Sequence, residues 1–266
     1  MEIGFIQFQP HLANVSKTIL DLENLIDAAD SSDLIVLPEL CNSGYNFENY
    51  QMAWDTSEEI SQSPFIEFLV SKTSEHNLFV VSGFNERDKD LLYNSAVLVG
   101  PKGVVGKYRK LHLFMNEKDF FAPGNVGLPV FDIGICKIGM LVCFDWIHPE
   151  VWRILALKGA DIICHPSNLV LPGLAQRGIP IHALINRIYI ITANRIGQER
   201  DLKFTGLSTI ADPKGDVLLQ LSEDEKEVGT VKIDITLARN KNITPRNNIF
   251  TDRRPDEYAF LVTKSA

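Results

Sequence analysis

The sequence lacks the features that mark exported, membrane-spanning and disulfide-stabilised proteins. Its 266 residues include only 4 Cys, and none of them forms a CxxC pair. No apolar run approaches the roughly 18 residues of a membrane span, and the first ten residues carry no basic segment and no cleavage site of small residues. We therefore expect a cytoplasmic protein with free thiols, no membrane partner and no disulfide framework.

Excess positive charge and the common cofactor motifs are also missing. The chain has 26 Lys and Arg against 34 Asp and Glu, a formal charge of -8, so nucleic acid is not an expected partner. The patterns GxGxxG, GxxxxGK(S/T), HExxH and GxSxG do not occur, and the 6 His have no ligand-like spacing. These absences narrow an enzymatic function to chemistry carried out by side chains.

Short apolar runs alternate with amphipathic stretches, which predicts an α/β fold. Strands are predicted at 2–8, 33–38, 78–84, 93–100, 104–114, 137–143, 161–166, 189–194, 206–210, 217–221 and 227–233. Helices are predicted at 19–26, 63–76, 149–158 and 179–185. Turns at 101–103 and 213–215 predict two hairpins, which favour mixed sheets over a parallel Rossmann order. Two packed sheets covered by helices fit this pattern best.

The two halves of the chain resemble each other weakly. The runs 33–38 and 161–166 share the form Asp-(Leu or Ile)-Ile-x-x-Pro, and each follows a strand and a helix. We interpret this as an internal duplication in which Glu39 is the counterpart of Cys143. One domain is expected over 1–239. The segment 240–266, rich in Arg, Asn, Asp and Pro, is expected to form an arm that packs on a neighbouring subunit.

Two candidate catalytic residues stand where apolar strands end, the position at which open α/β sheets place their sites. Cys143 precedes a turn into a helix, and a helix N-terminus favours the thiolate. Simple core packing is the alternative for a cysteine. Glu39 follows an apolar run, where loss of water raises the pKa of a carboxyl group and suits a general base. A loop cap or a lysine partner is the alternative for Glu39.

Lys110 is the third candidate. Strand alternation places it on one face with Tyr108, His112 and Phe114, and the two aromatic neighbours suggest burial. The alternative is a solvated surface position. A buried ammonium group needs a nearby carboxylate, which Glu39 or Glu117 could provide.

Three segments taken together resemble the nitrilase superfamily of carbon-nitrogen hydrolases, in order and spacing, from Ile3 to about Tyr258. They are Leu37-Pro38-Glu39-Leu40 with Gly44-Tyr45, then Tyr108-Arg109-Lys110-Leu111-His112-Leu113-Phe114, then Gly139-Met140-Leu141-Val142-Cys143-Phe144-Asp145 with Pro149-Glu150. The resemblance implies a four-layer α-β-β-α sandwich of two mixed sheets and a catalytic triad of Glu39, Lys110 and Cys143. It also implies no metal and no organic cofactor, and gives Glu117 a role in orienting the substrate.

The implied chemistry is a double displacement. Glu39 takes the thiol proton of Cys143, and the thiolate attacks an amide or nitrile carbon. Lys110 and the backbone N–H of Phe144 are the expected donors to the developing negative charge. A thioester forms, ammonia or an amine leaves, and water activated by Glu39 releases the acid.

The expected substrate is a small amide or N-carbamoyl compound. Five residues adjoin the catalytic positions in sequence and are expected to line a small, partly aromatic pocket: Tyr45, Phe114, Phe144, Trp146 and Asn168. Typical nitrilases carry Cys-Trp-Glu where this chain has Cys-Phe-Asp, which makes nitrile hydrolysis the alternative.

We also expect a homodimer, or a higher homo-oligomer, formed through the helix 149–158. Its apolar residues Val151, Trp152, Leu155 and Leu157 support this, although packing inside the monomer is the alternative. Two rival functions remain open. A metal-dependent phosphoesterase would need acidic partners for His148 and His165, and a catalytically silent scaffold would keep the fold alone.

Overall fold

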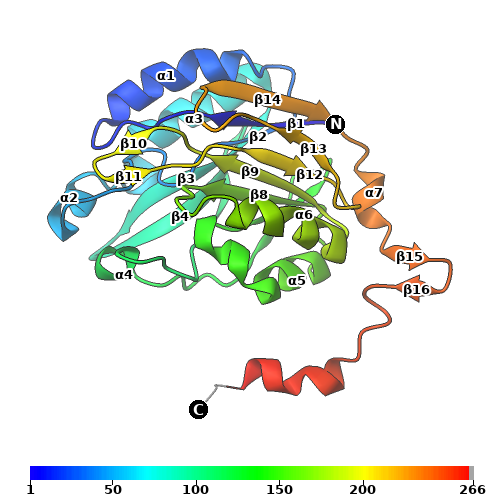
Figure 1. Ribbon diagram of the computed structural model, residues 1–266. Coiled ribbons are helices and arrows are strands. Elements are labelled where there is room, and N and C mark those ends of the chain that lie inside the picture. The colour runs from blue at the N-terminus through cyan, green and yellow to red at the C-terminus, as the bar shows by residue number, and fades with distance from the viewer. Residues whose placement is uncertain (264–266) are drawn as a thin grey trace.

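Two six-stranded mixed sheets form the centre of the computed structural model, which describes residues 1–263 (Figure 1). The first sheet has the order β14 (Glu227–Lys232), β1 (Glu2–Gln7), β2 (Leu34–Val36), β3 (Phe79–Asp88), β4 (Leu91–Gly100) and β5 (Gly103–Arg109). The second has the order β13 (Val217–Gln220), β12 (Thr209–Ala211), β9 (Tyr189–Asn194), β8 (Ile162–Ser167), β7 (Lys137–Met140) and β6 (Val130–Asp132). The predicted mixed sheets, with hairpins at 101–103 and 213–215, are confirmed.

The sheets pack face to face and helices cover their outer faces (Figure 1). Helices α1 (Val15–Asp27) and α3 (Pro64–His76) lie on the first sheet, and α5 (Pro149–Leu157) and α6 (Leu174–Asn186) on the second. Strand β2 shows how period-two alternation builds these layers. Its Val36 joins the core between the sheets, whereas Ile35 packs under α1 and α3. The four-layer sandwich is therefore confirmed.

The weak duplication corresponds to a repeated backbone arrangement. Strands β1, β2 and β3 are parallel neighbours in one sheet, as β7, β8 and β9 are in the other. Asp33 Oδ2 accepts a hydrogen bond from Glu2 N at 2.7 Å, and Asp161 Oδ2 accepts one from Lys137 N at 3.0 Å. The same aspartates donate their backbone N–H groups to the carbonyls of Glu2 and Lys137. The shared Asp therefore ties the same two strands together in each half.

The predicted pairing of Glu39 with Cys143 in this duplication is wrong. Strand register aligns β1 with β7 and β2 with β8. Counting along the aligned strands shows that Glu39 in the first half is equivalent to Ser167 in the second. In the same way, Cys143 in the second half is equivalent to Phe8 in the first. The reason is that Cys143 follows the first parallel strand of its half, whereas Glu39 follows the second.

Two predicted strands end early, and both ends shape the site. Strand β5 stops at Arg109 instead of reaching residue 114, so the alternation argument for Lys110, His112 and Phe114 does not hold. Strand β7 stops at Met140, and a 3-10 helix begins at Cys143. Apolar residues continue past both strand ends, so the pattern could not mark where pairing stops.

Several short elements were not predicted. They are α2 (Tyr50–Asp55), a 3-10 helix (Ile60–Gln62), α4 (Glu117–Phe120), β6 of the second sheet, β10 (Gln198–Glu199), β11 (Leu202–Lys203), α7 (Thr236–Arg239), β15 (Asn242–Thr244) and β16 (Asn247–Asn248). Helix α6 also begins earlier than predicted and carries Pro180 within it. No helix in residues 1–263 has the length and apolarity needed to cross a membrane.

The C-terminal arm extends away from the body (Figure 1). It contains the β15–β16 hairpin and a 3-10 helix, Pro255–Val262, in which Phe260 and Val262 are 83% and 86% exposed. Residues 264–266 of the predicted arm lie outside the described residues.

The prediction that α5 presents an apolar surface is largely wrong. Val151, Trp152 and Leu155 are buried in the monomer, and only Leu157 of the four predicted residues is exposed. These three side chains pack against the outer face of the second sheet, because α5 covers that face.

Candidate active site

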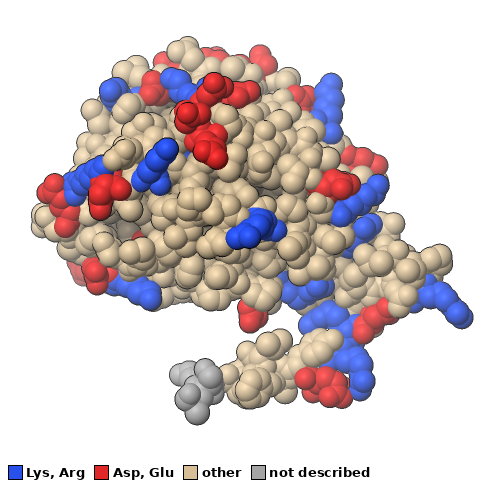
Figure 2. All heavy atoms as spheres, in the orientation of Figure 1, with Lys and Arg blue, Asp and Glu red and all other residues tan. Residues whose placement is uncertain are grey.

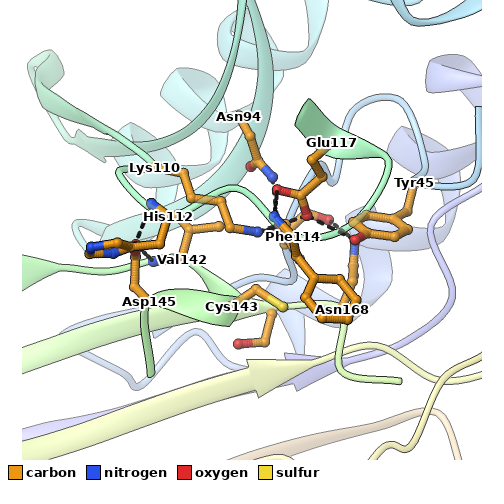
Figure 3. Close-up of polar contacts among 12 residues, drawn as sticks. Tyr45, Asn94, Lys110, His112, Phe114, Glu117, Val142, Cys143, Asp145 and Asn168 are labelled. Atoms are coloured by element: carbon orange, nitrogen blue, oxygen red, sulfur yellow. Dashed lines mark hydrogen bonds and ion pairs between the residues drawn. The ribbon is translucent and has the colours of Figure 1, made fainter. Parts of the chain in front are cut away.

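Lys110 lies at the centre of a buried polar cluster between the two sheets (Figure 3). Its Nζ is 2.7 Å from Glu39 Oε1 and 2.8 Å from Glu117 Oε1. It is the first residue after β5, and its backbone N–H still bonds Asn94 of β4 at 2.8 Å, which directs the side chain inward. Lys110 is 1% exposed, so the solvated alternative is wrong.

Burial alone would lower the pKa of Lys110, but the charges of Glu117 and Glu39 outweigh it. The pKa of Lys110 is therefore raised above its ordinary value. An ammonium group with this pKa stays charged at neutral pH. The site thus holds a permanent positive charge out of contact with water.

Hydrogen bonds and a close backbone contact hold Glu39 in place. Its Oε1 also accepts a hydrogen bond from Asn94 Nδ2 at 2.7 Å, and its carbonyl accepts one from Asn168 Nδ2 at 2.9 Å. A Cβ added to Gly83 would lie 2.3 Å from the Glu39 Cα, so only glycine allows β3 to approach this closely. Glu39 Oε2 has no hydrogen-bond partner among residues 1–263. That buried oxygen is the acceptor available to a substrate or a proton.

Glu117 begins α4 and is 4% exposed. Its Oε1 accepts a hydrogen bond from Tyr45 Oη at 2.8 Å, and its Oε2 accepts one from Phe114 N at 3.2 Å. Burial raises the pKa of Glu117, the charge of Lys110 opposes this, and Glu39 raises the pKa further. Lys110 thus holds two carboxylates that would otherwise repel each other.

Cys143 opens its 3-10 helix with a φ of +42°, a conformation that is strained for a non-glycine residue. Its carbonyl accepts a hydrogen bond from His165 Nε2 at 2.9 Å, which stabilises this turn.

The thiol of Cys143 is protonated at rest, contrary to the predicted effect of a helix N-terminus. Burial and the charge of Glu39 raise the pKa of Cys143 well above its ordinary value, although Lys110 and the backbone N–H of Asn168 lower it. The expected helix, α5, begins only at Pro149. Cys143 therefore needs a base to become a nucleophile.

Two adjoining hollows open next to these residues. The first is lined by Phe114, Cys143, Phe144, Trp146, Asn168, Leu169, Val170, Leu171, Leu174 and Ala175. The second is lined by Tyr45, Asn46, Phe47, Phe114, Met115, Asn116, Glu117, Phe120, Phe121, Val170, Asp201 and Leu202. Phe114 and Val170 line both. The structure thus brings all six residues predicted to bind substrate to the two hollows.

Sequence reasoning missed several buried polar groups around the triad. Asn94 bonds Glu39, and its signal was a polar residue inside the apolar run 93–100. Arg195 and Glu199 form a buried ion pair at 2.5 Å, and Glu199 Oε2 accepts a hydrogen bond from Tyr45 N at 3.0 Å. Arg195 and Glu199 are four residues apart, but Tyr45 comes from a distant segment, so no local pattern could reveal that this ion pair supports the site.

The histidines considered for a metal centre have other partners. His165 bonds the Cys143 carbonyl and faces Thr192, and His148 stacks on His112 with ring centroids 3.6 Å apart. Within residues 1–263 the one cluster of potential ligands is Asp27, Glu75 and His76, on α1 and α3.

That cluster already contains a cation. Lys72 Nζ lies 2.6 Å from Asp27 and 3.3 Å from Glu75, so the ammonium group takes the position that a metal ion would need.

Comparison with known proteins gives matches over most of the chain. The carbon-nitrogen hydrolase family model matches residues 2–242. A protein named nitrilase from Pyrococcus abyssi is 47% identical over 97% of this chain and 99% of its own length. An (R)-stereoselective amidase from a Pseudomonas species is 34% identical over 80% of this chain and 76% of its own length. The solved carbon-nitrogen hydrolase from Helicobacter pylori G27 superposes with a TM-score of 0.88 at 25% identity, covering 100% of this chain and 99% of that one.

Proposed function

The chain belongs to the carbon-nitrogen hydrolase family, and on that premise we propose that it hydrolyses a small amide or N-carbamoyl compound through an acyl-enzyme on Cys143. The observation that carries the proposal is the buried Lys110, which Glu39 and Glu117 hold in place beside Cys143 (Figure 3). This arrangement combines a base, a fixed positive charge and a thiol in one desolvated site.

The first half of the reaction forms the thioester. Glu39 Oε2 accepts the thiol proton while Sγ of Cys143 attacks the carbonyl carbon, and the C=O electron pair moves to oxygen. The Lys110 ammonium and the Phe144 N–H donate to that oxyanion. When the tetrahedral species collapses, Glu39 returns its proton to the leaving nitrogen, and ammonia or an amine departs.

The second half repeats these steps with water. Glu39 takes a proton from water, whose oxygen attacks the thioester carbon, and the carboxylic acid leaves as Sγ recovers a proton from Glu39. The raised pKa of Cys143 makes the base necessary in the first half. The raised pKa of Lys110 keeps the oxyanion donor charged through both halves.

Hydrogen bonding favours an amide or N-carbamoyl group over a nitrile. An –NH2 group brings two donors, and the site offers the unpaired Glu39 Oε2 and the carboxylate of Glu117 as acceptors. A nitrile nitrogen has no donor and leaves Glu39 Oε2 unpaired. The sequence Cys-Phe-Asp at 143–145, in place of Cys-Trp-Glu, points the same way.

Nitrile hydrolysis is the second candidate, because the 47% identical relative is named a nitrilase. Ammonia release from short aliphatic amides, N-carbamoyl amines and dinitriles separates the candidates. Intact-protein mass spectrometry of wild type and Cys143→Ala, run in parallel, detects the acyl adduct. We expect an adduct and the highest kcat/KM on amides or carbamoyl compounds. Higher kcat/KM on nitriles would select the second candidate, and no ammonia together with a Cys143 inert to alkylation would select the scaffold.

We also propose that the arm 240–266 packs on a second copy of the chain. The arm leaves the body and bears exposed Phe260, Leu261 and Val262 (Figure 1). Acidic and basic side chains lie side by side on its visible surface (Figure 2). Light scattering of the full chain and of a chain ending at residue 254 tests this. We expect a dimer for the first and a shift towards monomer for the second, whereas a monomer for both contradicts the proposal.

A further inference from the structure

The carboxylate of Asp145 accepts four hydrogen bonds from two separate segments (Figure 3). Oδ2 accepts from Tyr108 Oη at 2.8 Å and from Val142 N at 3.0 Å. Oδ1 accepts from His112 N at 3.2 Å and from His112 Nδ1 at 2.7 Å. The side chain is fully buried. Asp145 plays no part in the chemistry described above.

The two segments come from different sheets. Residues 108–112 continue from β5 of the first sheet and carry Lys110, which lies between Tyr108 and His112 in the chain. Residues 142–145 follow β7 of the second sheet and carry Cys143. The Asp145 carboxylate therefore joins the segment that holds the ammonium group to the turn that holds the nucleophile.

The bond to Val142 also fixes the turn itself. Asp145 N donates to the Val142 carbonyl at 3.1 Å while Asp145 Oδ2 accepts from Val142 N, so the two residues bond reciprocally around Cys143 and Phe144. Cys143 has a φ of +42° within this loop, a conformation that only surrounding contacts can hold. The direction of the Phe144 N–H depends on the same turn.

We propose that Asp145 is a positioning residue that sets the distance between the two oxyanion donors, Lys110 and the Phe144 N–H, and aims Cys143 between them. The inference rests on the proposed function, since it assumes that these donors stabilise the same oxyanion. A donor contributes to catalysis only when it lies close to the position that the oxyanion takes in the transition state. One carboxylate bonded to both segments fixes that geometry before substrate arrives.

His112 links this arrangement to the surface. Its side chain is 30% exposed and stacks on His148. The His148 ring in turn meets the Phe144 ring edge to face, with ring centroids 5.9 Å apart. Two of the four bonds to Asp145 come from His112. Its side-chain donor can therefore be removed with less disturbance of the core than the Asp145 carboxylate.

Asp145→Asn is the first test, measured as kcat per active site titrated by acyl-adduct formation. The amide keeps one acceptor oxygen, but its –NH2 group faces donors and cannot accept from them. We expect kcat to fall on the order of 10²-fold, the effect of a small misplacement of reacting groups, with KM within about twofold. A purely structural role would lower the melting temperature and the number of active sites, and leave kcat per site unchanged.

Two pairs of variants distinguish a positioning role of Asp145 from a general loss of stability. Tyr108→Phe removes the donor to Asp145, and Tyr189→Phe removes a similar buried hydroxyl that bonds the Asp234 carbonyl at 2.9 Å. Only the first is expected to lower kcat, by about tenfold for the lost hydrogen bond to Asp145. Tyr108→Phe also removes the acceptor of the Leu111 N–H, which lies 3.1 Å from Tyr108 Oη in the same segment. His112→Leu should lose a similar factor, and His112→Asn, which keeps a side-chain donor, should recover most of it.

Wild-type kcat per site in both Asp145→Asn and Tyr108→Phe overturns the inference. So does an equal loss of kcat in Tyr108→Phe and Tyr189→Phe. The proposed function fails on separate results: turnover that persists in Cys143→Ala, or a wild-type protein that forms no acyl adduct.

Discussion

The two halves of the molecule share one backbone plan but contribute different chemistry. In both, an Asp ties the first parallel strand to the second, and a proline, Pro38 or Pro166, stands at the equivalent place near the end of the second strand. After that proline the first half has Glu39 and the second has Ser167. After the first strand the first half has Phe8 and the second has Cys143. The proposed base and the proposed nucleophile thus come from positions that are not equivalent.

The comparison shows that the two halves share backbone positions, and that the residue at each position decides what that position contributes to the site. Leu37 and His165 occupy equivalent positions, yet Leu37 packs under α1 and α3 whereas His165 bonds the Cys143 carbonyl. The first half also contributes Lys110, Glu117 and Tyr45. Lys110 and its two carboxylate partners therefore come from one half, and the strained Cys143 comes from the other.

Among these variants, Glu39→Gln should lower kcat the most. The amide cannot accept the thiol proton, so kcat should fall by about 10³-fold, within the range for loss of general acid–base catalysis. Ser167→Ala, at the equivalent position of the other half, should keep kcat within a few-fold. Steady-state ammonia release measures both, and similar losses in the two variants would show that position, and not the carboxylate, matters.

Lys110→Met should cost on the order of 10²-fold in kcat, as for loss of one oxyanion donor. It also leaves Glu39 and Glu117 facing each other without a cation. Lys72→Met is the matched control. Lys72 is also buried, with 8% of the residue exposed, and it pairs with two carboxylates outside the site. We expect the control to lose stability and keep kcat per active site. A drop in kcat of equal size would contradict the role of Lys110.

His165 should make the second half more sensitive to acid. Burial lowers the pKa of His165 from 6.5 to about 4, despite its bond to the Cys143 carbonyl. Between these values the unfolded chain binds a proton that the folded chain does not, so stability falls as pH falls from about 6.5 towards 4. This one group should remove about 2 kcal/mol between pH 7 and pH 4.5.

Urea unfolding of wild type and His165→Leu at both pH values measures this contribution as a difference in pH dependence. The variant should lose less stability on acidification than wild type. Equal losses in the two proteins would show that His165 does not titrate as its burial implies.

His165→Leu also places the residue of the first half in the second. It removes the donor to the Cys143 carbonyl at 2.9 Å, so we expect kcat per active site to fall about tenfold, with KM little changed. The rate of Cys143 alkylation by iodoacetamide provides an independent measurement. An unchanged rate and kcat would mean that the turn holds its conformation without His165.

Much of the frame was predictable, and the errors have physical causes. Apolar periodicity located the main strands and helices, and the repeated Asp-x-Ile-x-x-Pro run indicated the duplication. The ends of β5 and β7 were missed because apolar residues continue beyond both strands. The surface role of α5 was misjudged because periodicity identifies an apolar face without identifying what covers it.

By itself, the sequence determined the α/β layers and the three segments that carry Glu39, Lys110 and Cys143, because strand and helix periodicity and short motifs are local properties. Only the tertiary structure decided that Lys110 lies between two carboxylates and that the Cys143 thiol keeps its proton. It alone brought Asp145 into contact with both the segment of Lys110 and the turn of Cys143. The pKa of a buried group depends on its desolvation and on charges from distant parts of the chain, so no single segment encodes it.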